Sequence, residues 1–273
     1  MPVPRHQNIG GQAPLPLNSF QDLELEIKKA IIPQKCAEIG QKNYKYLKLF
    51  SSKICPMKQS KRYETSGFVE AQHEPGSRGL VLKNLMGIKS KRKMDEIENI
   101  ALKQTEDYFF GRYDAKHRFK AKDICDMHRV WFGKIYPWAG QYRNIDLTKG
   151  IRFAHAKFIP QLMEGFERDY LARYTPSNFT NDDELIMALS ETHIELVLIH
   201  PFREGNGRIA RLLTTLMALQ AGKPLLDYGT IQEGKGKQEY FKAIRDGQGR
   251  NYTLMKKIFG RILEKTISRS KEK

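Results

Sequence analysis

Several stretches of the chain place apolar residues three or four positions apart, which is the spacing of one face of an α-helix. The clearest stretch follows the i, i+3, i+4, i+7, i+8 pattern with Ile209, Leu212, Leu213, Leu216 and Met217. Gly222 and Pro224 come next, an order typical of a helix C-terminus. Similar patterns predict further helices over residues 19–48, 93–110, 121–132, 158–174 and 182–199.

One segment, residues 144–160, departs from helical spacing. Its apolar residues alternate with polar ones on both sides of the turn-forming triplet Thr148-Lys149-Gly150, at Ile145, Leu147, Ile151 and Phe153. Alternation around a glycine-containing turn predicts a short β-hairpin. We therefore expect an all-α fold that carries one small β-hairpin.

Composition suggests three parts. Residues 1–18 are rich in Pro, Gly, Gln and Asn, and the turn sequence EPGSRG (74–79) separates the first part from the stronger helical patterns. We predict an N-terminal accessory region over 1–75, partly disordered, a main helical domain over 76–265, and a frayed basic tail over 266–273.

Bulk properties favour a cytoplasmic protein. The chain of 273 residues has no apolar run of membrane-spanning length and starts without an apolar leader segment. Its three cysteines (Cys36, Cys55 and Cys125) are widely spaced and form no CxxC pair, which supports neither a disulfide framework nor a zinc site.

The chain is strongly basic. It has 47 Lys and Arg against 31 Asp and Glu, a formal net charge of +16, which indicates either a polyanionic partner or simply a solvated basic surface. No zinc finger, basic heptad region or aromatic RNA-binding pattern accompanies the charge. We therefore treat nucleic acid as a secondary candidate partner.

The sequence HPFREGNGRIAR (200–211) concentrates candidate chemistry in the loop between two predicted helices. Gly205-Asn206-Gly207 allows a tight turn whose amides face a common point, directly before a helix N-terminus. Arg208 and Arg211 are one helical turn apart, so both guanidinium groups can face the same side. Backbone amides with two guanidinium groups form a site suited to a di- or triphosphate.

Two further residues of this loop suggest more than phosphate binding. Glu204 would repel bare phosphate, and its presence is explained if Mg²⁺ lies between the carboxylate and the phosphates. His200 is a candidate base, because an imidazole can accept a proton near neutral pH. The loop is not a Walker loop, because the GxxxxGK[ST] pattern is missing.

The same stretch resembles the signature of the Fic family, His-x-Phe-x-(Asp/Glu)-Gly-Asn-Gly-Arg-x-x-Arg, at every fixed position. The flanking sequences YPWAGQYR, HIELVLIHPF and ALQAGKPLLDY also resemble the family, so the resemblance covers roughly residues 80–262. It implies a Fic-type helical core with a β-hairpin flap, and a protein adenylyltransferase that moves AMP from ATP to a Tyr, Thr or Ser hydroxyl of a target protein.

The resemblance also implies a role for each loop residue. His200 is the base and Glu204 holds Mg²⁺. The segment Gly205, Asn206 and Gly207 holds phosphate oxygens, and Arg208 and Arg211 bind the β- and γ-phosphates. The flap residues Thr148, Lys149 and Gly150 are expected to position the target, although Lys149 could equally be a solvated turn residue.

Many Fic proteins carry an inhibitory helix whose glutamate pairs with the second signature arginine, here Arg211. Glu98-Asn99 fits part of that motif, but Met94 stands where Ser or Thr belongs. We therefore expect Glu98 to be an ordinary solvated helix residue. The toxin-like enzyme is then either unrestrained or held by a separate small antitoxin-like protein.

Four alternatives stay open from the sequence. The donor could be another nucleotide or phospho-donor, because the loop determines phosphate binding and not the base. The chain could be a basic nucleic-acid-binding regulator with a Fic-like core. It could be an effector delivered into another cell. Finally, GKGKQEYF (234–241) is a weak candidate for a second phosphate loop.

Overall fold

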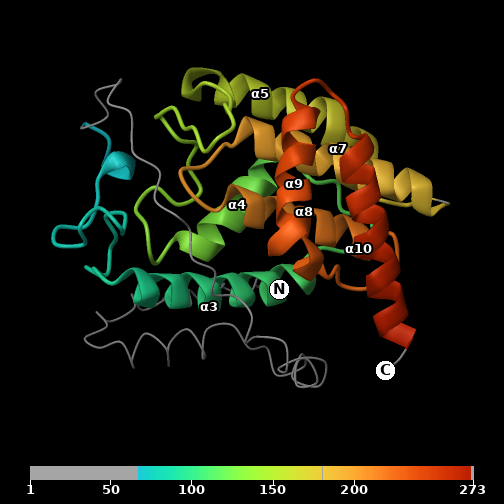
Figure 1. Cartoon of the computed structure of the whole chain (residues 1–273), viewed down its shortest axis with the longest axis horizontal. Coiled ribbons are helices and arrows are strands. Elements are labelled where there is room, and N and C mark those ends of the chain that lie inside the picture. The colour runs from blue at the N-terminus through green and yellow to red at the C-terminus, as the bar shows by residue number, and fades with distance from the viewer. Residues whose placement is uncertain (1–66, 180, 272–273) are drawn as a thin grey trace, which may run out of the picture. The chain divides into compact units, whose positions relative to one another are not determined.

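The computed structural model describes residues 67–179 and 181–271 (Figure 1). These residues form, in order, the 3₁₀ turn η2 (Val69–Ala71), α3 (Lys91–Phe110), α4 (Ala121–Phe132), the 3₁₀ turn η3 (Ala156–Phe158), α5 (Ile159–Phe166), the π-helical turn η4 (Glu167–Leu171), α6 (Ala172–Tyr174), α7 (Asp182–Ile199), α8 (Asn206–Gln220), the 3₁₀ turn η5 (Tyr228–Ile231), α9 (Gly234–Gly247) and α10 (Thr253–Lys271). The predicted helical core is confirmed. None of these helices is long and apolar enough to cross a membrane.

The helices follow the hydrophobic pattern closely. The stretches 93–110, 121–132 and 182–199 correspond to α3, α4 and α7, and 158–174 forms α5, η4 and α6 in succession. The glycine at the end of α8 is also confirmed as a cap. Gly222 has φ +70° and its N–H donates to the carbonyl of Leu219 at 3.0 Å. The helix expected over 19–48 lies outside the described residues.

The core is centred on α7 and α8. Helix α7 packs against α8, α10, α9 and α5, while α3 and α4 pack together and both contact α8. Apolar residues cover almost the whole circumference of α7, and Leu189, Ile194 and Leu196 are at most 1% exposed. A helix that is apolar on most sides is typical of the centre of a domain. The loop between α7 and α8 is therefore attached at both ends to the most buried helices.

The expected β-hairpin over 144–160 is not confirmed. The segment forms no strand, and its backbone pairing is limited to an isolated antiparallel bridge between Thr148 and Arg152. The physical reason lies at its base, where the buried guanidinium of Arg143 donates to the carbonyls of Ile145 and Ala154, both at 2.6 Å. These carbonyls are bonded to a side chain, so they are not available for a regular ladder. We refer to residues 145–154 as the flap.

Packed residues extend past the expected limits of the main domain at both ends. Before Gly76, Glu70 is buried and its carboxylate accepts the N–H of Asn144 at 2.6 Å. Of the basic tail expected over 266–273, residues 266–271 belong to α10. Thr266 is buried there, where its hydroxyl accepts the N–H of Asp227 at 3.0 Å.

This tail contact gives a test of the domain boundary. We expect Thr266→Val to lower the free energy of unfolding by about 1 to 2 kcal/mol, because the Asp227 N–H then loses its buried acceptor. Urea denaturation followed by circular dichroism measures this. Ser270→Ala is the control, because Ser270 is exposed on the same helix and donates only to the carbonyl of Ile267. Equal stability of the two variants would contradict the prediction.

Candidate active site

The loop between α7 and α8 begins and ends with left-handed backbone. His200 caps the C-terminus of α7 with φ +53°, and Gly205 caps the N-terminus of α8 with φ +83°. Phe202, between them, is completely buried and stacks on His128 with ring centroids 3.9 Å apart. Phe202 therefore anchors the loop in the core, and the amides of Asn206 and Gly207 at the start of α8 remain available at its open side, whereas the Arg208 N–H donates to the carbonyl of Gly205.

Gly205 is required for two reasons. A side chain with this φ is strained, and a Cβ would lie 2.6 Å from a ring carbon of Trp131 and 2.8 Å from one of Phe132. Both rings belong to α4 and are buried. The loop thus lies directly against α4 at a distance that only glycine permits.

Side-chain hydrogen bonds hold the loop closed. Asn206 uses both ends of its amide on Phe202, accepting from the backbone N–H at 2.8 Å and donating to the carbonyl at 2.7 Å. His128 accepts the N–H of Gly140 at Nδ1, so its Nε2 carries the hydrogen and donates to the carbonyl of Glu204 at 3.2 Å. The side chain of Asn206 is therefore occupied within the loop, and only its backbone amide is left for a phosphate.

His200 is oriented for proton transfer. Its Nδ1 lies 3.0 Å from the carbonyl oxygen of Val197. A carbonyl can only accept, so Nδ1 carries the hydrogen and Nε2 holds the free lone pair. The ring stacks on Phe153 of the flap with centroids 3.6 Å apart. Burial is the main cause that lowers the pKa of His200 to about 4, which keeps the imidazole neutral at pH 7.

The surroundings of Glu204 favour its charged form, whereas those of His200 favour the neutral form. Although burial raises its pKa, Lys149 and Arg208 outweigh this effect and, with the Gly205 N–H, lower the pKa of Glu204 to about 2. Its side chain is 31% exposed, with Lys149 Nζ at 3.2 Å and Arg208 at 3.7 Å. No cluster of three or more potential metal-binding side chains occurs in the described parts of the chain. A single ionised carboxylate still suits Mg²⁺, which commonly takes one or two protein carboxylates and completes its shell with water and substrate phosphates.

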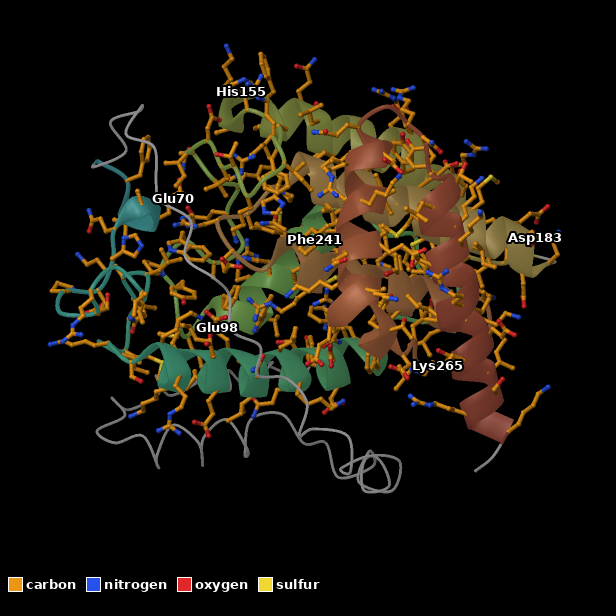
Figure 2. The ribbon with its side chains drawn as sticks, viewed as in Figure 1. Glu70, Glu98, His155, Asp183, Phe241 and Lys265 are labelled. Atoms are coloured by element: carbon orange, nitrogen blue, oxygen red, sulfur yellow. The ribbon has the colours of Figure 1, made fainter. Side chains whose placement is uncertain are left out.

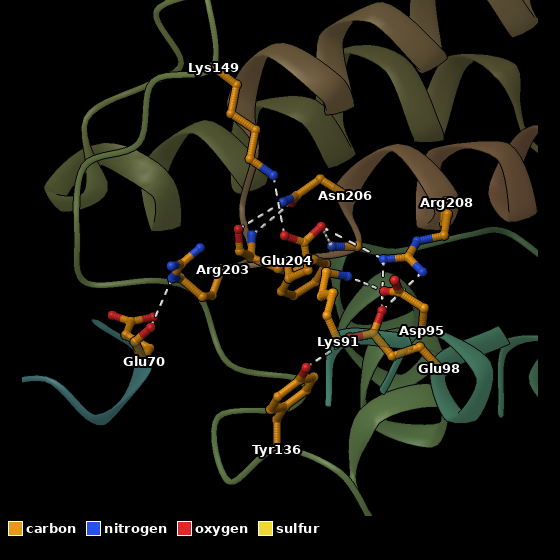
Figure 3. A network of polar contacts seen from close by, with 12 residues as sticks. Glu70, Lys91, Asp95, Glu98, Tyr136, Lys149, Arg203, Glu204, Asn206 and Arg208 are labelled. Atoms are coloured by element: carbon orange, nitrogen blue, oxygen red, sulfur yellow. Dashed lines mark hydrogen bonds and ion pairs between the residues drawn. The ribbon is translucent and has the colours of Figure 1, made fainter. Parts of the chain in front are cut away.

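The two signature arginines differ in their surroundings. Arg208 donates from both terminal nitrogens to one carboxylate oxygen of Glu98 at 3.2 Å (Figure 3). Its guanidinium also lies over the ring of Trp131. Arg211 is half-buried and forms no salt bridge with any described residue. A Cβ placed on Gly207 would lie 3.8 Å from its NH1 atom. The guanidinium of Arg211 therefore lies beside the first turn of α8, where it interacts electrostatically with Glu106 of α3 but forms no direct ion pair with it.

The flap and the loop are joined by a buried arginine. Besides its bonds to the flap, Arg143 donates from Nε to the carbonyl of His200 at 2.7 Å. Its side chain is fully buried. The flap and the backbone of His200 thus share one rigid connection, which the sequence pattern did not indicate because YPWAGQYR predicted only a turn.

Residues 118–218 match the model of the Fic/DOC family. A probable protein adenylyltransferase of Sinorhizobium fredii, y4lH, is 30% identical over 148 residues, which are 53% of this chain and 74% of that protein. The chain belongs to the Fic/DOC family.

Other relatives extend the similarity. The protein adenylyltransferase VbhT of Bartonella schoenbuchensis is 29% identical over 216 residues, which are 77% of this Fic chain and 42% of that protein. The chain therefore spans less than half of this relative. Among solved structures, the N-terminal Fic domain of an effector protein from Bartonella sp. AR 15-3 has a TM-score of 0.60 at 21% identity, covering 75% of this chain and 95% of that one. A Bartonella quintana Fic domain with bound ADP has a TM-score of 0.55 at 25% identity, covering 66% and 89%.

The prediction that Glu98 is a solvated helix residue is wrong. Glu98 is only 5% exposed and points from α3 into the interior (Figure 2). The hydroxyl of Tyr136 donates to its carboxylate at 2.8 Å, and Arg208 binds the other oxygen. The pairing is with the first signature arginine, whereas the inhibitory glutamate of the family is expected to pair with the second. Apolar spacing could not identify this residue, since Glu98 follows buried Ile97 in a helix with charged residues on several sides.

The neutral state of His200 can be tested directly. We expect the Cε1–H resonance of His200 to stay unshifted between pH 8 and pH 5.5, because a group with a pKa of about 4 remains almost entirely neutral in that range. Two-dimensional NMR of the labelled protein measures this, with the resonance assigned by its loss in His200→Ala and free imidazole as the internal control. A titration midpoint between pH 6 and pH 7 would show that burial does not control this group.

The two loop glycines give a matched test of packing. We expect Gly205→Ala to lower the free energy of unfolding by roughly 2 to 4 kcal/mol, because left-handed backbone and overlap with Trp131 both oppose a methyl group. Gly207→Ala should stay within about 1 kcal/mol of wild type, since its Cβ meets only ordinary contact and lies in a helix. Chemical denaturation compares the two, and similar losses would refute the close approach at Gly205.

Proposed function

We propose that this protein is a protein adenylyltransferase, which transfers AMP from ATP to a Tyr, Thr or Ser hydroxyl of a target protein and releases pyrophosphate. The main support is that one loop carries a neutral imidazole with a free Nε2, an ionised carboxylate and the amides of a helix N-terminus. The relatives named protein adenylyltransferase and the ADP-bound Fic domain support the same reaction class.

His200 is proposed to act as the general base. Nε2 takes the proton of the target hydroxyl, the oxygen attacks the α-phosphorus, and the bond from that phosphorus to the oxygen leading to the β-phosphate breaks. A pKa of about 4 makes a weak base in the ligand-free site. The negative charge of bound phosphates favours the imidazolium form, which raises the pKa and strengthens the base when substrate is present. A positioned base of this kind typically contributes about 10²–10⁴ in rate.

The remaining loop residues are proposed to bind the nucleotide phosphates. The amides of Asn206 and Gly207 hold phosphate oxygens, and that of Gly205 joins them by exchanging its bond to the Glu204 carboxylate, which measures 3.1 Å without a ligand. The dipole of α8 favours negative charge at that point. Arg208 and Arg211 bind the β- and γ-phosphates, which leaves the α-phosphate facing His200. Stabilising the charge that develops on these oxygens is the larger part of catalysis in such reactions.

Glu204 is proposed to hold Mg²⁺, and it fits this role because its carboxylate is ionised and partly exposed. When bound, Mg²⁺ would neutralise phosphate charge. Lys149 pairs with Glu204 at 3.2 Å and balances its charge. Lys149 is also more than half exposed, which is compatible with the proposed contact to a target.

The flap is proposed to position the target protein. Thr148, Lys149 and Gly150 are exposed at its tip, and only one bridge pairs its two arms. An extended target segment could therefore add to the flap through backbone hydrogen bonds. Arg143 would keep the flap, and with it the added segment, at a constant distance from His200, because it donates to the carbonyls of Ala154 in the flap and of His200.

Alternatives are less well supported. A Doc-like kinase is disfavoured by Gly207 and Arg208, which match the transferase form of the signature. A nucleic-acid-binding regulator has no need of an oriented His200 and an ionised Glu204. Another nucleotide donor remains compatible with the loop. Arg211 has no salt-bridge partner in the described part of the chain, which is compatible with inhibition by a separate antitoxin-like protein.

The decisive experiment uses ATP labelled at different phosphates. We expect purified protein with Mg²⁺ and cell lysate to transfer label to a protein band from α-³²P-ATP and not from γ-³²P-ATP, because the α-phosphate is the one attacked. His200→Ala should lose the label by at least a hundredfold. His155→Ala is the control, because His155 is an exposed histidine that follows the flap and is paired with Asp146.

Other labelling results would contradict AMP transfer or change the donor. Label from γ-³²P-ATP would refute AMP transfer and indicate a kinase. Label from another α-³²P-nucleotide with none from ATP would change the donor. Equal labelling by wild type and His200→Ala would remove the proposed base, and salt-sensitive nucleic-acid binding without any labelling would favour a regulator.

A further inference from the structure

Arg208 is held by a buried network that the transferase reaction does not by itself require. Glu98 of α3 accepts from NH1 and NH2 of Arg208 with the same carboxylate oxygen, both at 3.2 Å. The hydroxyl of Tyr136 donates to the second oxygen of Glu98 at 2.8 Å. The backbone carbonyl of Glu98 accepts the indole N–H of Trp131 at 2.8 Å. The Cζ atom of Arg208 lies over the Trp131 ring, 4.4 Å from the ring centroid.

We propose that Glu98 and Tyr136 are positioning residues, which fix the guanidinium of Arg208 toward the β- and γ-phosphates of the nucleotide. This inference rests on the proposed function and deepens it. The Tyr136 hydroxyl holds one oxygen of the Glu98 carboxylate and leaves the other directed at Arg208 (Figure 3). The Trp131 indole holds the Glu98 backbone, so the carboxylate is a stationary acceptor. A long flexible arginine held in one geometry loses less conformational freedom when a phosphate binds.

The geometry favours positioning over competition with the phosphates. A guanidinium has five N–H donors, and Glu98 occupies two of them, so three remain for a ligand. The Glu98 side chain is 7% exposed and that of Arg208 is 24% exposed. The carboxylate thus lies on the interior side of the arginine, and the more exposed side of the guanidinium is left for phosphate.

The network also explains why α3 and α4 contact the start of α8. Trp131 bonds to Glu98, packs under Arg208 and lies against Gly205 at a distance that admits no Cβ. The same ring therefore contacts the phosphate loop and the residues that orient its arginine. A shift of α3 would move Arg208 directly, so the helix belongs to the nucleotide site although it lies far earlier in the chain.

The test compares a nucleotide that carries the β- and γ-phosphates, which Arg208 is proposed to bind, with one that lacks them. Calorimetry with Mg²⁺ measures the dissociation constants of α,β-methylene-ATP, which cannot be cleaved at the α–β link, and of AMP. We expect Glu98→Gln to weaken α,β-methylene-ATP about tenfold and AMP less than twofold. Tyr136→Phe, the milder variant, should weaken α,β-methylene-ATP about two- to threefold, since it removes only one hydrogen bond to Glu98.

Two controls separate positioning from a general structural effect. Glu96→Gln changes an exposed glutamate of the same helix and should leave both constants unchanged. In an Arg208→Gln background, Glu98→Gln should add no further loss, because the residue through which it acts is missing. Thermal unfolding of each variant identifies any that fail to fold, in which case Tyr136→Phe carries the comparison.

Several results would overturn the proposal. Tighter binding of α,β-methylene-ATP by Glu98→Gln would make Glu98 a competitor of the phosphates. Equal weakening of both nucleotides, or an undiminished effect without Arg208, would assign Glu98 a purely structural role. If wild type binds α,β-methylene-ATP and Glu98→Gln binds it equally well, only this inference fails. If wild type binds neither nucleotide, the proposed function fails with it.

Discussion

The structure around the signature loop depends on one constraint, which is that a tightly turned backbone in the protein interior must still have its polar groups bonded. The turn from His200 to Gly205 cannot bond to itself as a helix does. Buried side chains replace the missing ladder. Asn206 bonds to both polar groups of Phe202, and Arg143 and His128 donate to the carbonyls of His200 and Glu204. The loop is therefore built into the core from several directions, and its open side is left for a ligand.

This construction separates the ionisation states of two neighbouring residues. Burial, with the positive charges of Lys149 and Arg143, lowers the pKa of His200 although the Val197 carbonyl and Glu204 oppose this, whereas Lys149 and Arg208 keep Glu204 ionised. A base and a cation ligand are needed in these opposite states at the same pH. Because Lys149 of the flap acts on both groups, the flap contributes to the electrostatics of the loop.

Helix α3 is more closely connected to the site than its position in the chain implies. Glu98 and Trp131 join α3, α4 and the first turn of α8 through one hydrogen bond, one ion pair and one cation–π contact. An unpaired carboxylate at this depth would be costly, so the pairing with Arg208 and Tyr136 also accounts for the stability of a buried charge. The contacts that stabilise the buried Glu98 carboxylate therefore also orient Arg208.

The pattern of residues along the chain was enough to predict α3, α4, α7 and α8, the loop that carries the candidate chemistry, and the family, whereas it did not predict α9 or α10. Periodic apolar residues require burial of one face, and this local rule placed α3, α4 and α7 within two residues of their observed bounds. The other features depend on contacts between distant segments. The flap forms no regular ladder because Arg143 donates to two of its carbonyls, and the Thr266 hydroxyl in α10 accepts the Asp227 N–H. Glu98 is buried because Tyr136 and Arg208 both bind its carboxylate. Periodicity reports which residues avoid water, whereas the partner of a buried polar group depends on contacts between distant segments, which no local pattern encodes.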